Sequence, residues 1–290
     1  MPSVKDLRER IRSLKNTQQI TKAMKQVAAA KIRRAEIAQK QARPYAQTLS
    51  EMLRDLMAST GNVDHPFMRP GAAGAPAGII LMTADKGLAG AFNSNVIRAG
   101  ELYRRAHGEA LFYSVGNKSR NAVRRWGMGE RPAWPLNAPS KLNAAREVAK
   151  AVTDDFTNGR IGEVTLISSK LVSMLSQKPE TRRLIPVAPA QAAGEPAQTA
   201  GPKAAVEFAP SREAVLSRLL PKYLEFTIFS AMLETDAAFY AAQLLAMSNA
   251  TDNAGKLIDE LTVQMNNARQ SAITKELLEI VGGAEALSGA

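Results

Sequence analysis

The fold is decided by residues 216–272, which read LSRLLPKYLEFTIFSAMLETDAAFYAAQLLAMSNATDNAGKLIDELTVQMNNARQSA. Apolar or small residues recur here at alternating spacings of three and four, from Leu216 through Leu233 and Ile258 to Ala272. About eight heptads of this spacing predict a coiled-coil helix. At about 1.5 Å per residue, such a helix would be on the order of 100 Å long. We therefore expect it to project from any globular body as a rod.

The ends of this helix carry start and stop signals. Ser211, followed by the acidic Glu213, predicts the start, and the pair Gly282-Gly283 predicts the stop. Pro221 lies in the first turns, so we expect either a kink there or a start just before it. We assign residues 208–285 to this C-terminal coiled-coil helix.

A second long helix is expected at the N-terminus, over residues 1–58. The same spacing runs from Ala28 to Leu56, while an earlier stripe at Leu7 loses its phase in the polar run NTQQITK, residues 16–22. That run predicts a bend or a change of packing partner. Pro44 removes a backbone donor and predicts a kink.

Between the two helices the pattern changes to short apolar runs typical of an α/β fold. Strands are predicted at residues 78–82, 110–115 and 164–168, helices at 95–106, 118–126 and 140–156, and a further strand, broken at QKPE, within 171–187. A mostly parallel sheet flanked by helices follows from this alternation. The predicted architecture is a long antiparallel coiled coil of the N- and C-terminal helices with an inserted Rossmann-like α/β domain, residues 77–187. A Pro/Ala-rich linker, residues 188–207, leads to the last helix.

Composition excludes several classes of protein. There are no cysteines and only two histidines, His65 and His107. Disulfides, thiol nucleophiles and Cys-ligated metals are therefore excluded, and we expect no metal or cofactor. No stretch approaches the roughly 18 to 20 apolar residues of a membrane span, and the opening MPSVKDLRER has no apolar core behind its charges. We expect a soluble, unprocessed chain.

The formal net charge is +11, and it is unevenly spread. Residues 1–58 hold 13 basic and 5 acidic side chains, net +8, whereas residues 206–290 hold 6 and 11, net −5. The two ends are electrostatically complementary, as two paired helices would be. The basic cluster at Lys31, Arg33 and Arg34 leaves a nucleic-acid-binding coiled coil as an alternative, although no aromatic residues interleave with it.

Two motifs invite a chemical interpretation and are better read as structure. The loop TADKGLAGAFNSN, residues 83–95, contains Gly87 and Gly90 but neither the GxGxxG of dinucleotide binders nor the GK[ST] ending of a P-loop. It is predicted to be a structural turn rather than a nucleotide site. Asp154 and Asp155 are adjacent, hence about 100° apart on a helix, and predict a solvated face rather than an acid/base pair.

Five segments, spread in order along the chain, resemble a known family. They are LRERIRSLKNTQQITKAMKQVAAAKIRRA (7–35), ARPYA (42–46), the TADKGLAGAFNSN loop, SQKPETRRLIP (176–186) and MSNATDNAGKLIDELTVQMNNARQSAITKELLEIVGGAEAL (247–287). Together they closely resemble the gamma subunit of F-type ATP synthase.

This resemblance implies a central rotor stalk rather than an enzyme. It would couple proton flow through the membrane sector to ATP synthesis, or hydrolysis, in the hexamer of alpha and beta subunits. The coiled coil would lie inside that hexamer, and the α/β domain would sit at the foot, near the epsilon subunit and the membrane c-ring. The absence of a transit peptide favours a bacterial protein, peripheral on the cytoplasmic side of the inner membrane.

The resemblance also implies which residues contact partners. Met24 and Lys25 fall where the family contacts the lever region of the beta subunit. Arg269, Gln270 and Thr274 fall in the family's ARQ..IT segment, which is expected at the same contact zone.

Three positions depart from the family pattern. Gln243 and Ser248 stand where relatives commonly carry basic residues, and Ala209 replaces an acid before the C-terminal helix. These departures put the contacts of the stalk in doubt, but not the resemblance.

Overall fold

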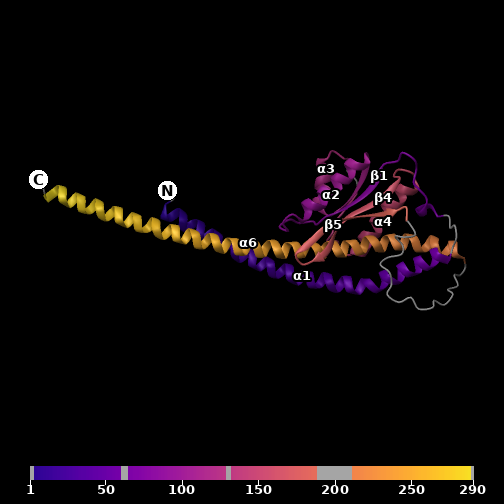
Figure 1. Ribbon diagram of the computed structural model, residues 1–290, viewed down its shortest axis with the longest axis horizontal. Coiled ribbons are helices and arrows are strands. Elements are labelled where there is room, and N and C mark those ends of the chain that lie inside the picture. The colour runs from indigo at the N-terminus through magenta and orange to yellow at the C-terminus, as the bar shows by residue number, and fades with distance from the viewer. Residues whose placement is uncertain (1–2, 60–64, 129–131, 188–210, 289–290) are drawn as a thin grey trace. The chain divides into compact units, whose positions relative to one another are not determined.

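The computed structural model describes residues 3–59, 65–128, 132–187 and 211–288. Its elements, in order, are α1 (Val4–Ser59), the 3-10 helix η1 (Pro66–Met68), β1 (Ala77–Met82), α2 (Phe92–His107), β2 (Ala110–Val115), α3 (Asn117–Arg125), β3 (Ala133–Trp134), α4 (Lys141–Thr157), β4 (Glu163–Ser173), β5 (Ser176–Ile185) and α6 (Arg212–Ser288) (Figure 1). The linker expected at 188–207, like Ala209, lies outside the described residues.

Contacts divide the chain into two units, and both long helices contribute to each. The helical unit comprises the described residues up to Ala28 and from Leu244 onward. The α/β unit runs from Ala29 to Gln243 and therefore includes the later part of α1 and the first part of α6.

The helical unit begins at a capping box on α1. The Ser3 N–H donates to Asp6 Oδ2 at 3.1 Å, and the Asp6 N–H donates to Ser3 Oγ at 3.2 Å. These reciprocal bonds satisfy two backbone donors that a helix N-terminus leaves open. They also lower the pKa of the Asp6 carboxyl below its ordinary value.

Within the helical unit, α1 and α6 pack antiparallel, as predicted. The buried seam consists of Leu7, Ile11, Thr21 and Ala28 from α1 and Met247, Ala254 and Ile258 from α6. Residues later in α1 meet residues earlier in α6, since Thr21 contacts Thr251 and Lys25 contacts Ser248. Most neighbouring seam residues on each helix lie four or seven positions apart, which is the spacing of a heptad repeat.

The polar run at residues 16–22 leaves α1 unbroken and forms a polar layer in this seam. Thr251 Oγ1 donates to Thr21 Oγ1 at 2.8 Å, and Gln18 Nε2 donates to the Thr251 carbonyl at 3.5 Å. Gly255 makes room for Gln18, because a Cβ there would lie 3.1 Å from its Nε2. A polar layer among apolar ones favours one register of the two helices over its neighbours.

The α/β unit is built on a five-stranded sheet of order β3-β2-β1-β4-β5, parallel except for β5. Alternate residues of β1 and β2, among them Ile79 and Phe112, face α2 and α3, which contribute Val96 and Val123 to one core cluster. The predicted strands and helices of this region are confirmed. The two-residue strand β3 was not predicted, since it is too short to show a pattern.

The prediction that QKPE breaks the last strand is wrong. These residues lie inside β5, where Pro179 stands opposite Ser169 of β4. A proline is tolerated there because β5 is an edge strand, so the donor that proline lacks would face away from the sheet. The chain reverses before this point, between Ser173 and Ser176.

The start of α6 agrees with the prediction, because the Ser211 hydroxyl accepts the Ala214 N–H at 3.2 Å, but its predicted end is wrong. It begins at Arg212 with Pro221 inside it, and it continues through Gly282-Gly283 to Ser288. The glycines do not stop the helix because each costs only about 1 kcal/mol relative to alanine, and good helix formers follow. Pro44 likewise lies inside α1. No helix in the described ranges carries an apolar stretch of the length that a bilayer crossing requires.

The solvated face expected at Asp154 and Asp155 is only half correct. Asp155 is buried, accepts a hydrogen bond from the Tyr113 hydroxyl and pairs with Arg160 at 3.1 Å. Burial of this carboxylate is tolerated because it is both paired and hydrogen-bonded. Asp155 therefore links α4 to the sheet.

Candidate functional site

Met24 and Lys25 lie in the helical unit, half-buried on α1. The Lys25 Nζ donates to the Ser248 hydroxyl at 3.0 Å across the helix pair. A basic residue at position 248 would set two cations against each other here, so the serine suits Lys25.

Arg269, Gln270 and Thr274 are exposed on α6. The Thr274 hydroxyl donates to the Gln270 carbonyl at 3.0 Å, one helical turn back. Arg269 lies about 30 Å along the helix from Ser248, at about 1.5 Å per residue. The two predicted groups thus form two separate surfaces of the helical unit, not one cluster.

The last part of α6 exposes a row of large apolar side chains, which we name the C-terminal apolar surface. Its members and their exposed fractions are Ile273 49%, Leu277 57%, Leu278 67%, Ile280 63% and Val281 59%. The register set by Thr21 and Thr251 places the start of α1 beside about residue 268, so this end of α6 extends past its partner helix. Exposed apolar side chains grouped in this way are typical of surfaces that bind other proteins.

A second group of residues, not predicted from sequence, joins α6 to the rest of the α/β unit. Lys141 at the start of α4 pairs with Asp236 of α6 at 3.2 Å. Lys31 Nζ of α1 donates to the Tyr240 hydroxyl at 3.1 Å, and that hydroxyl in turn donates to Asn137 Oδ1 at 3.5 Å. The sequence signal for this group is Asp236 itself, an acidic residue within a largely apolar run, since a buried carboxylate requires a partner.

Asp236 is 7% exposed, and its carboxyl has a raised pKa. Burial is the largest cause, and the nearby Asp85 carboxylate adds to it. Lys141 and Lys31 act in the opposite direction but do not offset the burial. Among the described residues, Asp236 Oδ1 has no hydrogen-bond partner, which agrees with an incompletely solvated charge.

We predict that Lys141→Met destabilises the α/β unit by about 3 kcal/mol at pH 7 and by much less at pH 4. A raised folded pKa means that the folded state binds the proton more tightly, so stability falls as pH rises from the ordinary 3.8 through the folded pKa. Removing the cation raises that pKa further and leaves a buried, unpaired charge at neutral pH. Urea unfolding at both pH values measures this difference.

The matched control is Lys150→Met, which removes an exposed lysine from the same helix α4. It should change the free energy of unfolding by less than about 0.5 kcal/mol at either pH. Equal losses for Lys141→Met at pH 4 and pH 7 would show that Asp236 carries no buried charge.

The side chains of Asp85 and Asn93 fix the loop after β1 by hydrogen bonds, as expected for a structural turn. The Asp85 carboxylate accepts three backbone N–H bonds, from Asn117 at 3.1 Å, Leu136 at 3.2 Å and Asn137 at 2.9 Å. Asn93 accepts from the backbone at the start of the loop at 3.0 Å and donates back into it at 3.0 Å. These bonds hold the N-terminal ends of α2 and α3 in place around the loop.

The antiparallel helix pair and the five-stranded α/β unit together have the fold of an ATP synthase central-stalk subunit. A chain of the Euglena gracilis mitochondrial ATP synthase rotor matches with a TM-score of 0.65 at 19% identity, over 93% of this chain and 98% of that one. The family model described as ATP synthase matches residues 3–287.

Curated relatives are similar over their full length. The ATP synthase gamma chain of Pelotomaculum thermopropionicum is 44% identical over 99% of this chain and 100% of the relative. That of Heliobacterium modesticaldum is 43% identical with the same coverage. The chain therefore belongs to the ATP synthase gamma chain family.

Proposed function

We propose that this chain is the central rotor stalk of a bacterial ATP synthase and carries no catalytic site of its own. It would couple proton flow through the membrane sector to ATP synthesis, or hydrolysis, in the alpha/beta hexamer. The main support is full-length similarity to gamma chains at 44% identity. The C-terminal apolar surface adds to it, since a helix end that exposes five large apolar side chains fits insertion into a protein sleeve.

The proposed mechanism needs contacts rather than chemical groups. A turning stalk presents a different side to each beta subunit in succession. If one side favours one conformation of a beta subunit over another, rotation shifts the populations of conformations that differ in nucleotide affinity. The stalk can shift them only by as much as its contacts differ between those conformations.

We assign the contacts to the two separate surfaces of the helical unit. Met24 and Lys25 would meet the lever region of a beta subunit on one surface. Arg269, Gln270 and Thr274 would meet the hexamer on the other, next to the C-terminal apolar surface. The side chains of Arg269 and Gln270 are exposed and therefore accessible to a partner. Lys25 would have to share its ammonium with Ser248.

The remaining partners belong to the membrane side of the complex. We propose that the α/β unit binds the epsilon subunit and the c-ring, and that the chain lies on the cytoplasmic side of the inner membrane. The bacterial relatives support this placement, and contact with the membrane would come only through the complex. The nucleic-acid alternative has no observation in its favour, and Lys31 of the basic cluster is already engaged by Tyr240.

Reconstitution with matching alpha and beta subunits tests the proposal. ATP hydrolysis is measured with the chain, without it, and for the chain alone. We expect a stable complex whose multi-site hydrolysis depends on the chain, with none from the chain alone. Equal assembly and turnover without the chain, or hydrolysis by the chain alone, would contradict the proposal. In that case, binding to duplex DNA across a salt series would examine the alternative.

A further inference from the structure

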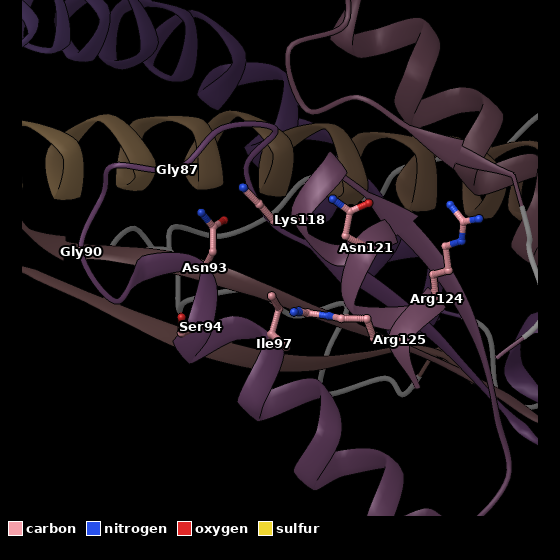
Figure 2. Close-up of a pocket in the computed structure, with 9 residues that line it drawn as sticks. All are labelled: Gly87, Gly90, Asn93, Ser94, Ile97, Lys118, Asn121, Arg124 and Arg125. Carbon is pink, nitrogen blue, oxygen red and sulfur yellow. The ribbon is translucent and has the colours of Figure 1, made fainter. Parts of the chain in front are cut away.

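A hollow of about 600 Å³ opens between the first turns of α2 and the length of α3, beside the loop after β1 (Figure 2). Its lining residues are Gly87, Gly90, Asn93, Ser94, Ile97, Lys118, Asn121, Arg124 and Arg125. It lies at the carboxyl ends of two neighbouring parallel strands, β1 and β2. The rotor function proposed above makes no use of it.

The hollow is strongly basic. Three of its nine lining residues are cations, and none is acidic. Figure 2 shows the Lys118 side chain reaching toward the loop at Gly87 and the Arg125 side chain reaching across toward Ile97. Within the described part of the chain, neither Lys118 nor Arg125 has an ion pair. An anion placed in the hollow between Lys118 and Arg125 would be stabilised by both positive charges.

The backbone around the hollow adds to this polarity. Helix α2 has Ala91 as its N-cap, with no side-chain cap and no acid in its first turn. The N–H groups of Asn93 and Ser94 donate to no described residue, whereas the first N–H groups of α3 are bonded to Asp85, Ala84 and Thr83. The partial positive charge of the α2 terminus therefore faces outward beside the two cations.

Two glycines of the loop after β1, Gly87 and Gly90, line the entrance of the hollow. A Cβ at Gly90 would meet nothing within 4 Å, and a Cβ at Gly87 would meet only the end of the Lys118 side chain, at 3.9 Å. At these two positions the loop therefore contributes no side chain to the hollow. A ligand can approach Lys118 there directly.

The lining also restricts the class of ligand. Ile97 is its one large apolar residue, and no aromatic ring is among the nine. A nucleobase would find no aromatic ring and only one large apolar side chain, whereas phosphate oxygens suit an ammonium, a guanidinium fork and backbone N–H groups. We propose that this hollow binds a compact multivalent phosphate-type anion, such as pyrophosphate, between Lys118, Arg125 and the N-terminus of α2.

Calorimetric titration of the full chain with pyrophosphate tests this proposal. The double variant Lys118→Gln, Arg125→Gln should weaken binding by about thirtyfold, because two charge-assisted contacts are lost. The matched control is Arg98→Gln, Arg120→Gln, which removes the same net charge from α2 and α3 at exposed positions outside the hollow. The control should change the affinity less than about threefold, as expected for long-range screening. All four side chains can be replaced without disturbing the core, which unchanged thermal unfolding verifies.

Two further titrations distinguish the source and class of the ligand. Tripolyphosphate and ATP should bind with similar affinity, since the base has no subsite. ATP binding at least tenfold tighter than tripolyphosphate would mean that the base is recognised, and it would overturn the proposal. So would the absence of pyrophosphate binding, equal weakening by the control variant, or binding of an acidic peptide but not pyrophosphate through Lys118 and Arg125. These outcomes leave the rotor function untouched, because that function is read from assembly and hydrolysis.

Discussion

Gly116→Ala is expected to destabilise the α/β unit by about 4 kcal/mol. Gly116 joins β2 to α3 with φ 92° and ψ 143°, a conformation essentially restricted to glycine. A Cβ there would lie 2.0 Å from the Thr83 carbonyl oxygen, which is backbone and cannot turn aside. The Gly116 N–H also donates to the Trp134 carbonyl at 2.7 Å, so a shift of Gly116 would loosen β3 as well. Urea unfolding of the full chain measures the loss.

Gly127→Ala is the matched control for this prediction. Gly127 also has a positive φ, 71°, but a Cβ there would meet nothing within 4 Å. It should therefore cost only about 1 kcal/mol, the conformational penalty alone. If the two variants lose the same stability, the close approach of Thr83 to Gly116 does not constrain the fold.

The second large effect is expected at the surface of α6 that we propose meets the alpha/beta hexamer. The double variant Arg269→Ala, Gln270→Ala should lower chain-dependent ATP hydrolysis in the reconstituted complex by about tenfold or more, since arginines at interface centres commonly contribute 2 kcal/mol or more. Both side chains are exposed, so the fold of the free chain should be unaffected. Helicity and the thermal midpoint, measured by circular dichroism, check that expectation.

A control on the same helix removes the same groups elsewhere. Lys256→Ala, Gln264→Ala also takes one cation and one amide from exposed positions of α6. It should leave hydrolysis within about twofold, as surface substitutions usually do. Equal losses for the two double variants would remove the special role assigned to Arg269 and Gln270.

The helices and most of the sheet could be predicted because each has a periodic signal. The exceptions have physical reasons. The 3-4 spacing along α6 predicted a single buried face. Residues outside that face are buried as well, among them Leu220, Leu224, Ile228 and Met232. In the α/β unit this helix packs against more than one neighbour, and a helix buried on several sides does not show a single apolar stripe.

The sites were harder to predict than the elements. Met24 and Arg269 came from a family resemblance, and periodicity alone would have treated them as ordinary helix positions. The Lys141–Asp236 pair joins residues almost a hundred positions apart in the sequence. The basic hollow is lined by residues of both α2 and α3, and no phosphate-loop motif precedes it. Such pairings depend on tertiary packing, which no local pattern encodes.

Rotation of a single label tests the central claim most directly. Because the chain has no cysteine, Lys178→Cys at an exposed position of β5 gives one attachment point for an optical probe. With the alpha/beta hexamer immobilised and ATP supplied, we predict that the probe turns continuously in one direction and stops when ATP is removed. A probe that stays fixed, or only fluctuates, while the same complexes hydrolyse ATP would contradict the rotor account.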